Sequence, residues 1–197
     1  MTVFHLIRHG LYDAVDRVLT GQSPGRALNA AGLAQAERLG AALAGLPIAA
    51  VVASPLQRTR ETAAPIARSL RLEVVENPGF LEVDYGAWTG LTAASLDGDP
   101  IWQLWNTARG IAATPGGEAM VDVQARATGQ LRRLHAEMPD AEIAVVSHCD
   151  VIRAMLCAAL GMPLDMLLRL DVAPASRSVV VLHPYGVEVR HINLPID

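Results

Sequence analysis

Three short apolar runs, each followed at once by polar residues and a helical pattern, constrain the fold of this chain most strongly. The runs occupy residues 3–7, 48–53 and 143–146. Apolar runs of this length that contain β-branched residues are typical of buried strands. Strands that alternate with covering helices predict an α/β fold with a mostly parallel central sheet, in which the carboxyl ends of the strands meet at one edge.

Composition narrows the class of protein. The chain has 197 residues, 51% of them hydrophobic, and a formal net charge of -4. These values predict one globular domain over residues 1–197 and offer no basic stripe for nucleic acid. No apolar run reaches membrane-spanning length and the N-terminus lacks a secretory pattern, so we expect a cytoplasmic protein that does not bind membranes. Cys149 and Cys157 lie eight positions apart on one expected helix, about 12 Å, which is too far for a disulfide.

The remaining elements follow the same alternation. Residues 11–28 are expected to be a loop. Residues 83–117 carry all three tryptophans and several glycines and prolines without a uniform period, so we interpret them as a lid-like insertion over the edge of the sheet. We expect helices over residues 30–44, 118–138 and 150–160, a further strand over 72–76, and a hairpin of 179–182 with 187–192.

The strand over 48–53 runs into a strong helix-start signal. Ser54 as N-cap and Pro55 at the first helical position predict that a helix begins here, with Arg58 in its first turn. Free backbone N–H groups and the positive end of the helix dipole attract an anion, and an arginine adds bidentate donors. A solvated surface charge is the alternative interpretation of Arg58. Pro65 is expected to kink or end this helix.

Three strand ends are expected to share one pocket. They carry Arg8 and His9, the segment 54–58, and His148, so two histidines, two arginines and two helix N-termini converge. Such a set of donors and positive charges suits a dianionic phosphate without a metal. A metal site is the competing interpretation, but neither histidine has a second ligand at short spacing, and the arginines would repel the ion.

The motifs in these positions resemble those of a known family. The chain is identified as similar to the histidine phosphatase superfamily, in the branch that includes cofactor-dependent phosphoglycerate mutases. The resemblance implies a three-layer α/β/α fold of the phosphoglycerate mutase type. The matching segments are Leu6-Ile7-Arg8-His9-Gly10, residues 53–63 (ASPLQRTRETA), residues 81–90 (LEVDYGAWTG), Pro115-Gly116-Gly117-Glu118 and Val145-Val146-Ser147-His148.

The resemblance also implies roles for five residues. His9 is the expected nucleophile, which forms a phosphohistidine, while Arg8, Arg58 and His148 bind the phosphoryl oxygens. Glu82 occupies the position from which the family protonates the departing oxygen. That role requires a raised pKa, which nearby apolar side chains such as Phe80 and Trp88 could supply by desolvation. No metal and no cofactor are expected.

The chain departs from the family pattern just after Gly10. Leu11 replaces the usual glutamate, and the asparagine that commonly holds phosphate has no counterpart in residues 12–16, which read YDAVD. Thr20 and Gly21 match a loop that touches substrate in the family, and Thr20 could supply the missing donor. Cys149 replaces the usual glycine after the second histidine, and its backbone N–H could still point at phosphate.

Three functions are compatible with these residues. The first is a metal-independent phosphomonoesterase acting on a small phosphate ester; the second is a phosphoglycerate mutase with the same phosphohistidine. The third, a non-catalytic phosphate-binding module, is disfavoured because all five site residues are present. The missing glutamate and asparagine favour the phosphatase. The tryptophans of residues 83–117 could stack on a flat substrate or pack against each other, and the apolar composition allows a homodimer.

Overall fold

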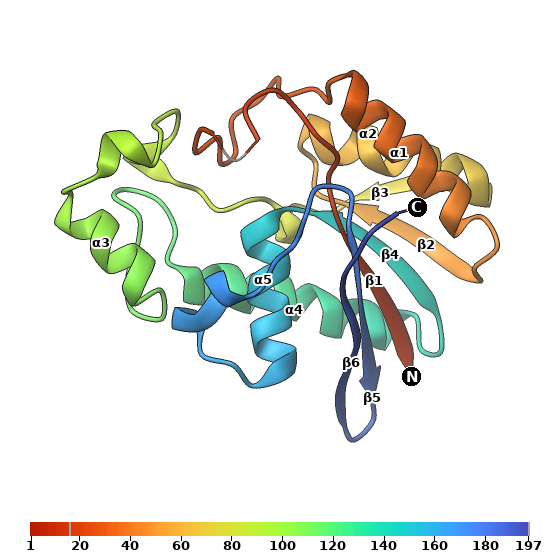
Figure 1. The fold of residues 1–197 in the computed structure, drawn as a ribbon. Coiled ribbons are helices and arrows are strands. Elements are labelled where there is room, and N and C mark those ends of the chain that lie inside the picture. Colours follow the sequence, from red (N-terminus) through yellow and green to blue (C-terminus); the bar gives the residue numbers. More distant parts are fainter. Residues whose placement is uncertain (16, 197) are drawn as a thin grey trace.

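A central sheet organises the chain. In the computed structural model, which describes residues 1–15 and 17–196, six strands pair in the order β3-β2-β4-β1-β5-β6 (Figure 1). Strands β1 to β4 are parallel, and β5 and β6 form an antiparallel hairpin on the β1 side. The strands are β1 (Thr2–Arg8), β2 (Ile48–Ala53), β3 (Val74–Glu76), β4 (Glu142–Ser147), β5 (Arg177–His183) and β6 (Gly186–Leu194).

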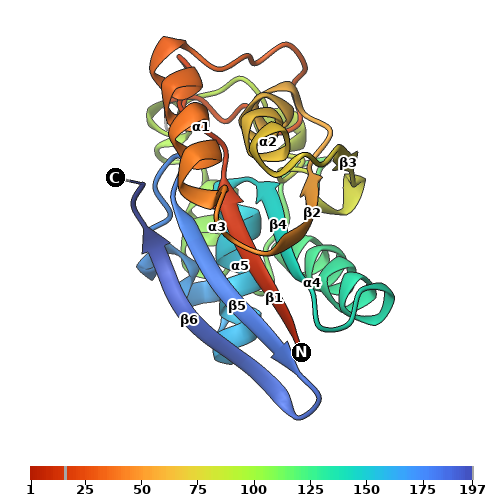
Figure 2. The ribbon, with the colours of Figure 1, turned by 90° about the vertical axis from the view of Figure 1, so that its right-hand side faces the viewer.

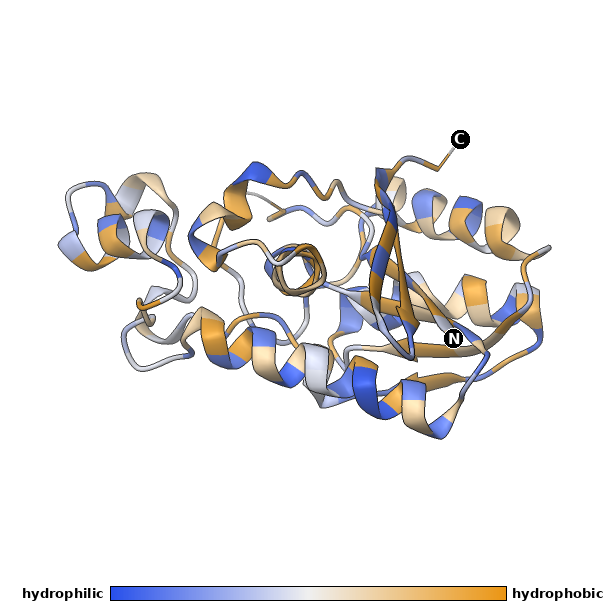
Figure 3. Cartoon of the chain, turned by 90° about the horizontal axis from the view of Figure 1, so that it is seen from below, coloured by the Kyte–Doolittle hydropathy of each residue, from blue (hydrophilic) through white to orange (hydrophobic). Residues whose placement is uncertain are grey.

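Helices cover both faces of the sheet. Phe4 and Leu6 of β1 pack into a core with α4 and α5, whereas Ile7 packs into a second core with α1 and α2. Figure 2 shows the two pairs of helices on opposite sides of the strands, and Figure 3 shows that the strands of the sheet carry many apolar residues. The predicted α/β/α architecture is therefore confirmed. The helices are α1 (Ala30–Leu43), α2 (Gln57–Leu70), α3 (Pro100–Thr107), α4 (Met120–Glu137) and α5 (Cys149–Leu160).

The register of the parallel strands aligns their polar ends. Arg8 of β1 pairs with Ser147 of β4, and Ala53 of β2 pairs with Val146 of β4. Because β4 lies between β1 and β2, the residues that follow all three strands emerge side by side at the carboxyl edge of the sheet. The order and register of the strands thus bring the three strand ends together, as predicted.

The helix after β2 begins later than predicted. Leu56, not Ser54, is the residue before its first turn, and no side chain caps it. Ser54 does not cap the helix; its hydroxyl instead pairs with Nε2 of His148 at 2.8 Å. The helix also continues through Pro65 to Leu70, so the prediction that it could end at the proline is wrong. Arg58 still lies in the first turn.

The segment of residues 83–117 projects from the carboxyl edge of the sheet (Figure 1). It contains the short helices Gly86–Trp88 and Ala94–Leu96 in addition to α3. Trp88 contacts Trp102 and Trp105 edge-on, with ring centroids 5.3 and 6.1 Å apart, and both Trp88 and Trp105 are buried. Of the two alternatives for these rings, the structure favours packing within the segment. In the part of the chain described, no helix combines the length and apolar character needed to cross a membrane.

Candidate active site

His9 lies at the end of β1 with one ring nitrogen committed to the backbone. Its Nδ1 is 2.8 Å from the carbonyl oxygen of Gly10, and because a carbonyl only accepts, Nδ1 carries the proton. Burial, followed by the charges of Arg58 and Arg8, holds the pKa of His9 well below its usual value of 6.5. The ring is therefore neutral at pH 7, with the lone pair on Nε2, which is the state a nucleophile needs.

The turn that follows His9 is fixed by two close contacts. The N–H of Gly10 donates to the hydroxyl of Thr62 over 3.0 Å, and that hydroxyl donates to the carbonyl of Arg58 over 2.7 Å. A Cβ on Gly10 would lie 2.8 Å from the carbonyl oxygen of Gly32, at the start of α1. The φ of Gly10 is not positive, so its backbone conformation does not require glycine. The close approach of α1 is what leaves no room for a side chain at this position.

Two arginines supply the positive charge. Arg58 is 1% exposed, and its Nη2 donates to the carbonyl of Gly21 over 2.9 Å. Its Nε and Nη1 are buried without a hydrogen-bond partner among the described residues. Arg8 is 5% exposed and donates from Nη1 to the carbonyl of Val172 over 2.8 Å. The buried Arg58 donors that the described residues leave unsatisfied are suited to an anionic ligand.

His148 is buried at the start of α5, beside His9, with ring centroids 5.3 Å apart. Its Nε2 pairs with the Ser54 hydroxyl, and its Nδ1 has no partner among the described residues. Burial, then the Arg58 and His9 charges, hold the pKa of His148 well below 6.5. A neutral ring whose Nε2 accepts from Ser54 carries its proton on Nδ1, as a neutral donor.

Glu82 is buried next to these residues. Its carbonyl oxygen accepts from Gln22 over 2.9 Å and from Arg126 of α4 over 3.1 Å, and its Oε1 accepts from the N–H of Val83 over 3.0 Å. Burial raises the pKa of Glu82 to about 7, and the Asp150 carboxylate adds to the rise while Arg58 opposes it. The raised pKa required of a proton donor is therefore present, with burial as its main cause.

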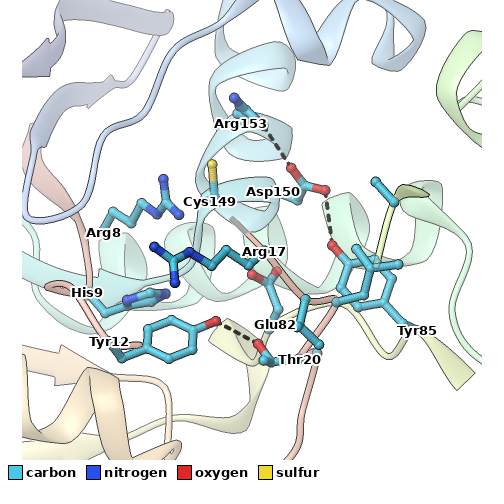
Figure 4. A pocket seen from close by; sticks show the side chains of 14 residues that line it. Arg8, His9, Tyr12, Arg17, Thr20, Glu82, Tyr85, Cys149, Asp150 and Arg153 are labelled. Carbon is cyan, nitrogen blue, oxygen red and sulfur yellow. Dashed lines mark hydrogen bonds and ion pairs between the residues drawn. The ribbon is translucent and has the colours of Figure 1, made fainter. Parts of the chain in front are cut away.

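A cavity of about 160 Å³ opens in front of His9. Arg8, His9, Glu82 and Cys149 line it together with residues of the loop 12–21 (Figure 4). Arg58 and His148 do not line it, but the ring of His148 lies 5.3 Å from that of His9, and the Arg58 guanidinium lies 5.5 Å from the ring of the lining residue Tyr12. The five residues predicted for catalysis thus come together at one end of the sheet. Among the described residues, no group of three or more His, Cys, Asp or Glu side chains is arranged to hold a metal ion.

Thr20, Gly21 and Cys149, which are predicted to bind substrate, differ in whether their polar groups are available to a ligand. Thr20 and Gly21 line the cavity, but the Thr20 hydroxyl is paired with the hydroxyl of Tyr12 at 2.7 Å. Cys149 begins α5, so its N–H is one of the free amides of that helix, and burial raises the pKa of its thiol to about 12. The position of Asp16, in the stretch where the family asparagine is missing, lies outside the described residues.

Sequence reasoning missed several residues of this cavity. Tyr12, Arg17, Tyr85, Asp150 and Arg153 also line it, and Figure 4 shows Arg17 reaching across toward Arg8. Two of these residues lie in recognisable patterns: Asp150 is at the expected start of a helix, three positions after β4 ends, and Tyr85 lies in the segment 81–90 that resembles the family motif. Tyr12, Arg17 and Arg153 carry no local pattern that distinguishes them from surface residues.

Comparison with known proteins places the chain in a family. A sequence profile of the histidine phosphatase superfamily (branch 1) matches residues 4–195. The chain is 38% identical over 197 residues to the bifunctional protein Rv2228c of Mycobacterium tuberculosis, which covers 95% of this chain and 52% of that protein. The chain therefore spans about half the length of that relative.

Two further proteins are similar over most of both chains. Phosphoserine phosphatase 1 of Hydrogenobacter thermophilus is 31% identical over 169 residues, which is 85% of this chain and 80% of that protein. The solved structure of a mycobacterial glucosyl-3-phosphoglycerate phosphatase superimposes with a TM-score of 0.88 at 26% identity, covering 98% of each chain.

Proposed function

The chain belongs to the histidine phosphatase superfamily, branch 1, and from this premise we propose that it is a metal-independent phosphomonoesterase that works through a phosphohistidine on His9. The observation that carries the proposal is the state of His9: a neutral ring with Nδ1–H bonded to Gly10 and a lone pair on Nε2, beside Arg8 and Arg58. The two phosphatases named above support the same reaction.

In the first step, the Nε2 lone pair of His9 attacks phosphorus and the P–O bond to the alcohol breaks. The departing oxygen keeps the bonding electrons and takes the proton of Glu82, so the alcohol leaves neutral and Glu82 becomes a carboxylate. Arg8, Arg58 and the Nδ1–H of His148 donate to the phosphoryl oxygens, where charge is spread in the transition state. The bond from Nδ1 to Gly10 stabilises the positive charge that forms on the His9 ring.

In the second step, water attacks the phosphohistidine. Its proton passes to the Glu82 carboxylate, the N–P bond breaks, and Nε2 recovers its lone pair as inorganic phosphate leaves. Glu82 is protonated again and the cycle closes. A carboxyl with a pKa near 7 can serve as acid and then as base because both forms are accessible at neutral pH. The free amide of Cys149 is proposed to complete the phosphate cradle.

The test is hydrolysis of p-nitrophenyl phosphate by the purified protein with a chelator present. We expect His9→Ala to lower kcat/KM by a factor on the order of 10⁴ or more, since the nucleophile is lost. His191→Ala, on the exposed strand β6, is the matched control and should retain activity. Acid-labile, base-stable phosphate on the wild-type chain after rapid quenching, absent from His9→Ala, would identify the intermediate. Full activity in His9→Ala would refute the assignment.

The substrate is proposed to be a small organic phosphate. We propose that two segments determine which substrate binds. They are residues 11–26 and residues 83–117, the second acting as a lid. A screen should cover sugar phosphates, nucleotides, phosphoserine, phosphoglycerates, glucosyl-3-phosphoglycerate and α-ribazole phosphate. Rapid interconversion of 3- and 2-phosphoglycerate, primed by 2,3-bisphosphoglycerate, would instead identify a mutase.

A further inference from the structure

Asp150 is a buried carboxylate that no step above uses. It lies in the first turn of α5, is 8% exposed and lines the cavity. Arg109 donates to its Oδ2 over 2.8 Å, and Arg153 donates to its Oδ1 over 3.1 Å. Burial alone would raise the pKa of Asp150, but the two guanidiniums outweigh burial and hold it below its usual range. Asp150 is therefore ionised and fixed in orientation.

The ion pair with Arg109 connects α5 to the segment 83–117. Arg109 follows α3, is 4% exposed, and donates from Nε to the carbonyl of Trp105 over 3.0 Å. Its guanidinium lies 4.6 Å from the centroid of the Trp105 ring. The hydroxyl of Tyr85, from the same segment, donates to Oδ2 of Asp150 over 3.4 Å. Arg109, Arg153 and Tyr85 thus hold one carboxylate at the cavity wall, and Figure 4 shows the contacts from Arg153 and Tyr85.

Glu82 lines the same cavity, and no cation is bonded to its carboxyl among the described residues. Its Oε1 accepts a backbone N–H from Val83. The two carboxyl groups thus belong to one cavity and to buried residues, where solvent screens charge poorly. The other titratable or charged groups around Glu82 are Arg8 and His9 from the end of β1, Tyr12 and Arg17 from the loop, Arg58 from α2, Tyr85, Arg126 from α4, His148 before α5, and Cys149 and Arg153 from α5.

We propose that Asp150, clamped between Arg109 and Arg153, is a positioning residue that keeps the proton on Glu82 until the leaving group takes it. The inference rests on the role of Glu82 in the proposed function. A fixed negative charge disfavours a second negative charge in the same cavity, and this effect makes the Asp150 carboxylate the second cause, after burial, of the raised pKa of Glu82. Arg109 belongs to the clamp but not to the cavity lining.

The charges predict opposite effects for two substitutions. Asp150→Asn removes the negative charge and leaves the clamp arginines unbalanced, so the Glu82 carboxylate becomes easier to form and the proton is lost at lower pH. Arg109→Met removes a positive charge and leaves the negative one, so the proton is held to higher pH. A purely structural role would weaken both variants without moving their pH profiles in opposite directions.

The experiment measures kcat/KM against pH for hydrolysis of glycerol 2-phosphate, whose alcohol needs a proton to leave. In the wild type, activity falls on the basic side as Glu82 loses its proton, near the pKa of about 7. We expect Asp150→Asn to move this basic limb to lower pH by roughly half a unit or more, which is roughly a threefold loss on that limb, and Arg109→Met to move it to higher pH. The substrate's own ionisation is the same for every variant.

The matched control is Asp165→Asn. Asp165 is exposed and accepts the N–H of Gly110 over 2.7 Å, so the variant replaces a charged acceptor of the same segment by a neutral one without changing charge at the cavity. Its basic limb should stay at the wild-type pH. The leaving group of p-nitrophenyl phosphate needs little protonation. With this substrate, kcat/KM of Asp150→Asn should therefore fall only slightly on the basic side. If Asp150→Asn fails to fold, the double variant Asp150→Asn with Arg109→Met removes both charges. Its basic limb should still lie at a lower pH than the basic limb of Arg109→Met alone.

Two outcomes separate this inference from the function on which it rests. A basic limb that persists in Glu82→Gln overturns the assignment of Glu82 as the acid and this inference with it. The role of Asp150 is overturned, and the phosphatase proposal left intact, if the basic limb disappears in Glu82→Gln but keeps its wild-type pH in Asp150→Asn. The same conclusion follows if the limb disappears in Glu82→Gln but moves equally in Asp150→Asn and Asp165→Asn.

Discussion

The hydroxyl of Ser54 lies 2.8 Å from Nε2 of His148, and this bond joins the residues that follow two neighbouring strands, β2 and β4. Both side chains are buried. The serine therefore fixes the ring plane of His148 and determines which of its nitrogens is left to face a ligand. With the Ser54 hydroxyl engaged in this bond, the helix after β2 begins two residues later than its sequence suggests, at Gln57.

Ser54→Ala tests that bond. Removing the hydroxyl leaves a buried ring nitrogen unpaired, so we expect a loss of about 1–3 kcal/mol in the free energy of unfolding. Activity should fall by about tenfold because the ring is no longer aimed, which corresponds to about 1.4 kcal/mol. Urea denaturation and kcat/KM measure the two effects. Ser69→Ala, which removes a hydroxyl bonded to the carbonyl of Ile66 at the exposed end of α2, should change neither.

Thr62→Val tests the link between the His9 turn and α2. Valine has nearly the same shape but cannot accept from Gly10 or donate to the carbonyl of Arg58. We expect the free energy of unfolding to fall by about 1–3 kcal/mol and activity to fall with it, since the buried N–H of Gly10 is left unpaired. Thr107→Val, on exposed α3, loses a similar bond and should stay within about 0.5 kcal/mol of the wild type. Equal losses in the two variants would contradict this account.

Gly32→Ala and Gly129→Ala form a matched pair within helices. A Cβ at Gly32 would overlap the carbonyl oxygen of Leu11, whereas a Cβ at Gly129 would meet nothing within 4 Å. We expect Gly32→Ala to destabilise the protein by about 1–3 kcal/mol and Gly129→Ala to stabilise it by up to about 1 kcal/mol. Melting temperatures should therefore move in opposite directions, and a shift of the same sign in both would be inconsistent with this packing.

The two histidines of the site predict a specific loss of stability in acid. Burial, with the nearby arginines, lowers the pKa of both His9 and His148, so the unfolded chain takes up protons below pH 6.5 that the folded chain refuses. The contribution of each histidine to stability is therefore full above pH 6.5 and falls below it by about 1.4 kcal/mol per pH unit, while Glu82, whose pKa is raised to about 7, contributes the opposite slope. His9→Gln should remove one of these contributions in urea denaturation at pH 7 and pH 5. An unchanged slope would show that His9 is protonated in the fold.

Much of the fold could be predicted because it is written in local patterns. The apolar runs that end at Arg8, Ala53 and Ser147 are strands, and the alternation with helices correctly predicted a mostly parallel sheet. The register then brings these ends together, so the cluster of predicted site residues followed from topology. The start of α2 was predicted wrongly because Ser54 has two available partners, the local backbone and a distant histidine, and the distant one prevails.

The rest of the site depends on contacts between residues far apart in the chain. Arg109 and Asp150 are 41 positions apart, and Tyr85 and Asp150 are 65 apart. No period or spacing marks such pairs, since each residue alone has the pattern of a surface side chain. The orientation of the His148 ring and the pairing of Thr20 with Tyr12 likewise depend on which polar groups burial leaves available.

The position of β4 between β1 and β2 has a consequence for how the protein is made. Strands β1 and β2 do not pair with each other, because β4 lies between them. Arg8 and Arg58 therefore come together in one site only after β4 has paired with both strands. Because β4 begins at residue 142, a growing chain has synthesised both arginines and the nucleophile long before it can bind phosphate. Assembly of the site is thus a late, long-range event in folding.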